Sequence, residues 1–134
     1  MPTILFLCVA NAARSQMAEG LARAMAPADY RFLSAGSDPA GVLSPLAVQA
    51  LAEQHIDIAH HRSKGLEDIP LENVDTVVTL CADEVCPVVP GTVRRLHWPL
   101  PDPTDSASFR AIRDELRRRL PALWSEGTAD QPKR

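Results

Sequence analysis

Short, uniformly apolar runs alternate along the chain with longer segments in which apolar residues recur every three or four positions. A strand with one solvent-exposed face would alternate apolar and polar residues. The uniformly apolar runs therefore predict strands that are covered on both faces. Four such strands are expected: Thr3–Val9, Arg31–Ala35, Asp75–Leu80 and Val93–His97.

Three segments with helical periodicity lie between or after these strands. The first helix is expected over Arg14–Ala26, where apolar residues four positions apart share one face and Pro27 ends the helix. The second is expected to begin with Ser44 as its N-cap and Pro45 in its first turn, and to end near Gln54.

The last helix is expected from about Ser106 to Trp124, with a bend at Pro121. Its apolar stripe consists of Phe109, Ile112, Leu116, Leu120 and Leu123. Two i,i+4 ion pairs are expected on its solvent side: Asp114–Arg118 and Glu115–Arg119.

Strands that alternate with helices predict an α/β fold, with a parallel sheet covered by helices on both faces. The pattern fits a single domain over residues 1–125, followed by a flexible tail over residues 126–134. Ligands of such folds bind at the carboxyl ends of the strands, so the loops after the strands are the first place to look for chemistry.

Composition narrows the class of protein. Apolar residues make up 46% of the chain, charged residues 23%, and the net charge is -3, as in an ordinary globular protein without a nucleic-acid-binding surface. No run reaches the roughly 18 to 20 apolar residues that cross a bilayer, and the Ile4–Ala10 run lacks the flanks of a signal peptide. We therefore expect a cytoplasmic protein without a membrane partner.

The sharpest motif lies directly after the first strand, where five residues separate Cys8 from Arg14 at the start of a helix. A loop that curls into a helix N-terminus can aim about six backbone amides at one tetrahedral anion. Arg14 can add two hydrogen bonds to the oxygens of that anion. The expected oxyanion-binding residues are Val9, Ala10, Asn11, Ala12, Ala13, Arg14 and Ser15.

The same groups favour the thiolate form of Cys8, which is the nucleophilic form of cysteine. Ser15 can donate a hydrogen bond to the sulfur, and Asn11 tolerates the left-handed backbone that such a loop needs. The alternative is that Cys8 is a buried thiol at a strand end and Arg14 is a surface charge. The apolar strand before the motif and the amphipathic helix behind it favour the functional interpretation.

From Ile4 to Pro103 the chain resembles the low-molecular-weight protein tyrosine phosphatase fold and, more closely, the arsenate reductases built on that fold. The matching pieces are, in order, FLCVANAARSQMAEG, SAGSDPAGVLSPLAVQAL, HIDIAHHRSKGLEDI, VVTLCADEVCP and HWPLPDP. The resemblance implies a four-stranded parallel sheet flanked by helices on both faces.

The resemblance also implies a reaction. The Cys8 thiolate attacks the central atom of the oxyanion, and Asp102 protonates the leaving oxygen. Cys81 then attacks the Cys8 sulfur of the arseno adduct, expels arsenite and leaves a Cys8–Cys81 disulfide. Cys86 next attacks Cys81, and an external reductant breaks the resulting Cys81–Cys86 disulfide. The implied catalytic residues are Cys8, Arg14, Ser15, Cys81, Cys86 and Asp102.

The spacing of the second and third cysteines adds a physical constraint. In a regular helix the Cα atoms of Cys81 and Cys86 would be roughly 8.6 Å apart, whereas a disulfide accepts about 4.4–6.8 Å. We therefore predict that this loop changes conformation on oxidation and exposes a new surface to the reductant.

Two other functions stay open. Phosphatases of this kind usually carry tyrosines after the Asp-Pro pair, whereas Thr104 and Asp105 follow it here, so the cleft suits a small inorganic ion. A low-molecular-weight phosphatase is nevertheless the alternative if Cys81 and Cys86 are inert. A non-catalytic trap for arsenite or a soft metal would use the three sulfurs as ligands.

The expected substrate is arsenate, and the expected reductant is thioredoxin, with glutaredoxin, glutathione or another small thiol as alternatives. We expect a monomer without a cofactor, and the enzyme would serve arsenic detoxification. The histidines and cysteines lack the spacing of a zinc site, so no bound metal is expected. Some relatives bind a potassium ion beside the anion loop, but here Lys64 would supply an ammonium group instead.

Overall fold

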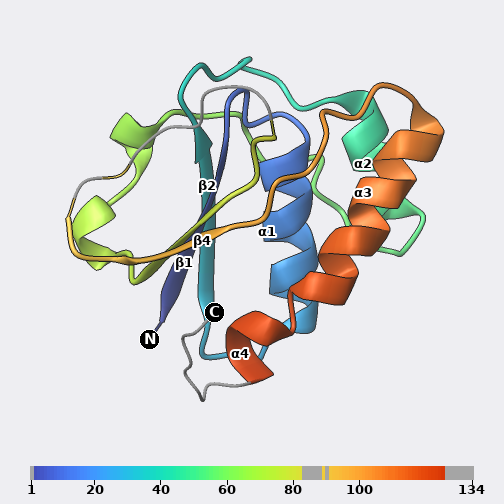
Figure 1. The fold of residues 1–134 in the computed structure, drawn as a ribbon. Helices are drawn as coiled ribbons and strands as arrows, with labels where there is room; N and C mark the ends of the chain where they lie inside the picture. The colour runs from blue at the N-terminus through green and yellow to red at the C-terminus, as the bar shows by residue number, and fades with distance from the viewer. Residues whose placement is uncertain (1, 83–88, 90, 126–134) are drawn as a thin grey trace.

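The computed structural model describes residues 2–82, 89 and 91–125, and its strands form one parallel sheet (Figure 1). The strands are β1 (Thr3–Cys8), β2 (Arg31–Gly36), β3 (Thr76–Thr79) and β4 (Arg94–His97), in the order β2-β1-β3-β4. The predicted four-stranded parallel sheet is confirmed, and each strand end lies within one residue of its predicted position. The expected flexible tail, residues 126–134, lies outside the described residues.

Helices cover both faces of the sheet, but the two faces differ (Figure 1). The α-helices lie on one side and are α1 (Arg14–Met25), α2 (Pro45–Ala52), α3 (Ser106–Arg119) and α4 (Ala122–Ser125). The other side carries two short 3₁₀ helices, η1 (Leu66–Asp68) and η2 (Leu71–Asn73). The 3₁₀ helices have no periodic apolar pattern, so the sequence did not indicate them.

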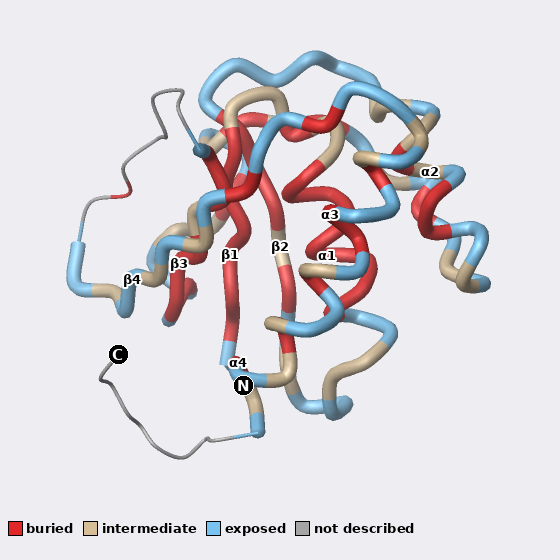
Figure 2. Tube along the Cα trace, turned by 45° about the vertical axis from the view of Figure 1, so that its right-hand side comes forward, coloured by how far each residue is buried: buried red, intermediate tan, exposed pale blue. Residues whose placement is uncertain are grey.

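The alternation of side chains along β1 divides the core into two parts. Ile4 and Phe6 point towards the α-helices and belong to the larger cluster, which includes the apolar stripe of α3. Leu5 and Leu7 point the other way, into a smaller cluster with residues of the 3₁₀ side. As Figure 2 shows, β1 is buried along its whole length, which explains why its sequence is uniformly apolar.

The last helix begins at Ser106 as predicted, but its C-terminal end differs from the prediction. Asp105 caps α3 by accepting a 2.8 Å hydrogen bond from the Ser108 amide, and the Ser108 hydroxyl in turn accepts from the Asp105 amide. The predicted helix to Trp124 is interrupted rather than bent, because α3 ends at Arg119 and α4 begins after Pro121. Ser44 is the N-cap residue of α2 as predicted, but its hydroxyl makes no capping hydrogen bond.

One of the two expected ion pairs on α3 is wrong. Glu115 pairs with Arg119 at 2.6 Å, as predicted. Asp114 pairs with its neighbour Arg113 at 2.8 Å, and Arg118 contacts Glu115 instead of Asp114. Arg113 is buried and also contacts Glu53 at 2.7 Å, so packing against α2 decides which carboxylate each arginine meets.

The parallel sheet brings three loops to one edge. β1 pairs with β3 such that Leu7 lies opposite Thr79, and β3 pairs with β4 such that Thr79 lies opposite His97. The segments that follow Cys8, Leu80 and His97 therefore leave the sheet side by side at its carboxyl edge, where ligands of this architecture bind. Among the described helices, none has the length and apolarity to cross a membrane.

Removal of the Asp105 cap should destabilise the fold in a pH-dependent way. Hydrogen bonds from Ser108 lower the pKa of Asp105. A carboxylate with a lowered native-state pKa stabilises the fold above its ordinary unfolded value, and this contribution is lost as pH falls through the native pKa. We expect Asp105→Ala to lower the melting temperature at pH 7, and the difference from wild type to shrink under acidic conditions.

Asp105→Asn is the matched control, because asparagine caps helices about as well as aspartate but does not titrate. Thermal unfolding followed by circular dichroism measures all three proteins. Equal melting temperatures for wild type and Asp105→Ala at pH 7 would contradict the assigned cap.

Candidate active site

The loop between β1 and α1 presents its carbonyl groups to neighbouring segments. Four successive carbonyl oxygens, from Val9 to Ala12, each accept a hydrogen bond from outside the loop. The donors, at 2.9–3.3 Å, are Asp38 to Val9, Ala40 and Ser63 to Ala10, Gln16 to Asn11, and Ser44 to Ala12.

These outward carbonyls fix the direction of the amides. In a trans peptide the C=O of one residue and the N–H of the next point in opposite directions, and none of the described peptide bonds is cis. The N–H groups of residues 10–13 therefore point into the loop. Within the described chain, no side chain caps α1 at Ala13 and its first turn carries no acidic residue, so the positive helix end also faces the loop interior. This arrangement can bind a tetrahedral oxyanion.

Cys8 lies at the base of this loop. It is free and only 2% exposed, and its Sγ is 2.9 Å from Oγ of the buried Ser15. Asn11 is fully buried and has a φ of 50°, in the left-handed region that the sequence argument expected. The predicted hydrogen bond between Ser15 and the sulfur is present, so the loop combines an anion site with a nucleophile.

Arg14 is held by the last of the three edge loops. Its Nη1 donates a 2.9 Å hydrogen bond to the Leu100 carbonyl, and its side chain is 5% exposed. Its Nη2 lies 3.8 Å from Oδ1 of Asp102, whose side chain is 78% exposed. The segment after β4 thus fixes the guanidinium beside the loop and also brings an accessible carboxyl group to it.

Cys81 follows β3 at the same edge. The Leu80 amide donates to the Leu7 carbonyl at 2.9 Å, which keeps the end of β3 in register with the end of β1. Neighbouring strands are about 4.8 Å apart, so Cys8 and Cys81 leave the sheet from adjacent positions. Cys81 is buried and disulfide-bonded. Cys86 and the predicted refolding of its loop lie outside the described residues.

Gly36, at the end of β2, supports the loop from its other side. A Cβ atom built on Gly36 would lie 2.2 Å from the Val9 carbonyl oxygen and 3.0 Å from the Asn11 amide nitrogen. Both atoms belong to the backbone of the anion loop and cannot swing aside as a side chain can. The strand predicted over Arg31–Ala35 stopped just before Gly36, and sequence reasoning missed the contact of this glycine with the loop.

One further residue, Gln16, contacts the loop and was missed as a site residue. Gln16, fully buried, donates from Nε2 to Oδ1 of Asn11 at 2.9 Å and to the Arg62 carbonyl at 2.9 Å, and its Oε1 lies 3.0 Å from Nδ1 of His61. The only sequence signal for Gln16 is a polar residue at a position that α1 buries.

Lys64 lies where the sequence argument placed an ammonium group. Its Nζ is 3.3 Å from the Arg62 carbonyl, 3.5 Å from Oγ of Ser34 and 4.0 Å from Oε1 of Glu19. Glu19 is buried and also pairs with Arg23 at 2.6 Å. Burial lowers the pKa of Lys64. Within the described residues, no cluster of three or more histidine, cysteine or carboxylate side chains could hold a metal ion.

The family model for low molecular weight phosphotyrosine protein phosphatases matches residues 3–133 of this sequence. The chain belongs to this family. The loop that carries Cys8 and Arg14 lies within the part of the chain that matches this family.

Named relatives of this family member are arsenate reductases. The chain is 42% identical over 119 residues to an arsenate reductase of Staphylococcus xylosus, covering 86% of this chain and 90% of that one. It matches the crystal structure of an arsenate reductase from Archaeoglobus fulgidus with a TM-score of 0.81 and 30% identity, over 90% and 97% of the two chains. A thioredoxin-dependent arsenate reductase of Corynebacterium glutamicum matches with a TM-score of 0.78 and 34% identity, over 94% and 61%.

A methyl group at Gly36 should damage oxyanion binding. We expect Gly36→Ala to weaken the binding of inorganic phosphate by about tenfold or more, because displacement of two loop backbone atoms costs more than the roughly 1.4 kcal/mol that a factor of ten represents. Isothermal titration calorimetry measures the affinity.

Gly91→Ala is the control for this prediction. Gly91 has a φ of 104° and no atom within 4 Å of its built Cβ, so alanine there adds backbone strain without contact to the loop. Unchanged phosphate affinity in Gly36→Ala would refute the supporting role of Gly36.

Proposed function

We propose that this chain reduces arsenate to arsenite with thiols as the electron source. One observation carries the proposal: a free, buried Cys8 lies in an anion loop, and a disulfide-bonded Cys81 lies at the end of the adjacent strand. A phosphatase needs only the first thiol. The names of the relatives support the same reaction.

In the first step the Cys8 thiolate attacks arsenic in arsenate held by the loop amides and Arg14. A sulfur–arsenic bond forms and an arsenic–oxygen bond breaks. Asp102 is the candidate acid that gives a proton to the leaving oxygen, since it is the accessible carboxyl group beside Arg14. The inward amides and the guanidinium stabilise the charge on the remaining oxygens.

In the second step the Cys81 thiolate attacks Sγ of Cys8. The sulfur–sulfur bond forms, the sulfur–arsenic bond breaks, and its electron pair stays on arsenic, which leaves as arsenite. Cys86 then attacks Cys81, releases Cys8 as a thiolate and completes the transfer of the disulfide. A free Cys8 together with an oxidised Cys81 corresponds to the state at the end of this sequence.

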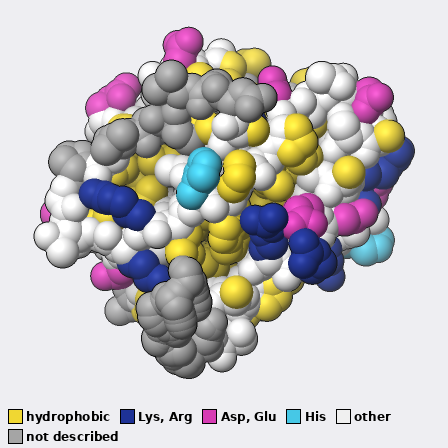
Figure 3. Space-filling view, in the orientation of Figure 1, with side chains coloured by type: hydrophobic (Ala, Val, Ile, Leu, Met, Phe, Trp, Pro, Cys, Tyr) yellow, Lys and Arg dark blue, Asp and Glu magenta, His cyan; other side chains and the backbone are white. Residues whose placement is uncertain are grey.

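The disulfide must be reduced by an external dithiol or thiol before the next turnover. We propose thioredoxin, which is the reductant named for the Corynebacterium glutamicum relative. The reaction would take place in the cytoplasm, where thiols are kept reduced, and the chain would act as a monomer. On the face in Figure 3, basic and acidic side chains lie beside one another on the right-hand side. Because the net charge of the chain is -3, the positive potential that attracts arsenate would be local to the loop.

Each cysteine should be essential for turnover. We expect Cys8→Ser, Cys81→Ser and Cys86→Ser each to abolish arsenate-dependent oxidation of NADPH in an assay coupled to thioredoxin and its reductase. Arg113→Lys on α3, whose side chain contacts Glu53, Asp114 and the Ala50 carbonyl, is a control that should keep full turnover apart from any loss of stability.

The same variants distinguish the alternatives. Hydrolysis of an aryl phosphate by Cys81→Ser and Cys86→Ser, with no arsenate-dependent turnover by the native chain, would establish a phosphatase and overturn the proposal. Stoichiometric binding of arsenite without turnover would indicate a thiol trap.

Turnover should not depend on potassium. We propose that Lys64 supplies the positive charge beside Glu19 and Ser34, so exchange of sodium for potassium chloride at constant ionic strength should leave the steady-state rate unchanged. Lys64→Met should lower this rate by a few-fold, because Glu19 then lacks one of its two cationic partners in a buried site. A several-fold activation of the wild-type enzyme by potassium would contradict the assignment.

A further inference from the structure

A continuous chain of side-chain hydrogen bonds links the nucleophile to a histidine at the surface. From Sγ of Cys8 it passes to Ser15 at 2.9 Å, to Asn11 at 2.8 Å, to Gln16 at 2.9 Å and to His61 at 3.0 Å. The three middle residues are fully buried, and His61 is partly exposed.

Backbone groups fix the orientation of both amides in this chain. The Lys64 backbone amide can only donate, and it lies 2.9 Å from Asn11, so the Asn11 atom there is the oxygen Oδ1. The Asn11 nitrogen Nδ2 then donates to Ser15. The Arg62 carbonyl can only accept, and it lies 2.9 Å from Gln16, so that Gln16 atom is the nitrogen Nε2.

These orientations fix the direction of every bond. Because Nε2 of Gln16 faces Asn11 and Arg62, its oxygen Oε1 faces His61, and Nδ1 of His61 must carry the proton. Ser15 accepts from Asn11 and has its own hydrogen left for Sγ of Cys8. All four bonds therefore donate towards the sulfur, and hydrogen bonds aligned in this way strengthen one another.

We propose that Gln16 is a positioning residue that couples His61 to the Cys8 thiolate through Asn11 and Ser15. This chain of hydrogen bonds deepens the proposed function, because it favours the thiolate form of Cys8 that attacks arsenate. A thiolate accepts the Ser15 hydrogen, whereas the S–H of a thiol would compete with it. Gln16 touches neither the substrate nor the sulfur. Its effect on reactivity would pass entirely through the orientation of Asn11 and Ser15.

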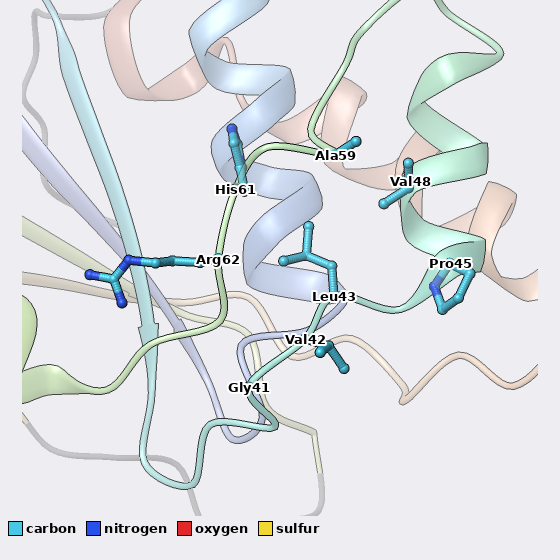
Figure 4. A pocket seen from close by; sticks show the side chains of 8 residues that line it. All are labelled: Gly41, Val42, Leu43, Pro45, Val48, Ala59, His61 and Arg62. Atoms are coloured by element: carbon cyan, nitrogen blue, oxygen red, sulfur yellow. The ribbon is translucent and has the colours of Figure 1, made fainter.

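His61 connects this chain of hydrogen bonds to solvent, because its side chain is partly exposed. It lines an open surface cavity of about 480 Å³ between the 59–62 segment and α2, and Figure 4 shows His61 across the cavity from Val48 and Pro45, with the Arg62 side chain pointing away from them. Its imidazole can therefore exchange a proton with water. The charged and titratable groups that act on it are Glu19, His60, Arg23 and Lys64, and burial lowers the pKa of His61. Protonation of His61 would place a positive charge at the outer end of the chain.

The test measures Cys8 itself rather than turnover. The rate at which iodoacetamide alkylates Cys8 in the reduced protein is followed by peptide mass spectrometry as a function of pH. The alkylation rate reports the fraction of Cys8 that is present as the reactive thiolate. It does not depend on arsenate, on Cys81 or on the reductant. A failure of the arsenate reductase assignment would leave this measurement unaffected.

Gln16→Met keeps the size of the side chain and removes the donors. We expect it to lower the alkylation rate of Cys8 at neutral pH by about 3- to 10-fold, the range that one net hydrogen bond represents, and to shift the pH profile upwards. His61→Leu should shift the profile in the same direction by less. His55→Asn, at an exposed histidine whose positive φ asparagine tolerates, should leave the profile unchanged.

A purely structural role would give a different result. In that case Gln16→Met would lower the melting temperature but leave the pH profile of Cys8 alkylation at its wild-type position, which would overturn the proposal. If Gln16→Met does not fold, His61→Leu provides the test, because His61 is only partly buried and its replacement should leave the fold intact. An unchanged pH profile of Cys8 alkylation in His61→Leu would show that His61 is not coupled to the Cys8 thiolate.

Discussion

The direction of four carbonyl groups in the loop after β1 is the constraint on which the rest of the site depends. Each of these carbonyls is bound by a segment outside the loop, and the planar peptide then turns the following amides inward. Four amides that share one centre would be unfavourable without an anion, so the surrounding hydrogen bonds hold the loop in a conformation that it would not keep alone. Several segments far apart in sequence contribute these bonds, which makes the loop a product of the whole fold.

The buried charged side chains near the loop also have partners of opposite charge or backbone acceptors. Arg14 is almost fully buried, and the Leu100 carbonyl holds it in place while leaving its other nitrogen near Asp102. Glu19 is buried between Arg23 and Lys64. Both arrangements satisfy polar groups that would otherwise cost several kcal/mol when removed from water, and both place positive charge close to the loop in a chain whose net charge is negative.

The parallel sheet explains how the second thiol reaches the first. Cys8 and Cys81 are more than seventy residues apart in sequence, yet they follow adjacent parallel strands that are held in register. The chain therefore needs no special loop to bring nucleophile and second cysteine together.

The sequence by itself determined the strands, the helices and the anion motif, because these follow from apolar periodicity, proline positions and the spacing of Cys8 and Arg14 within one continuous segment. It also placed Asn11 in a left-handed conformation and Ser15 next to the sulfur. Only the tertiary structure decided the partners of Asp114 and Arg118, the close contact of Gly36 with Val9, and the path from Gln16 to His61. These contacts join segments that periodicity treats separately, and a side chain's partner depends on packing and on backbone groups that no local pattern specifies.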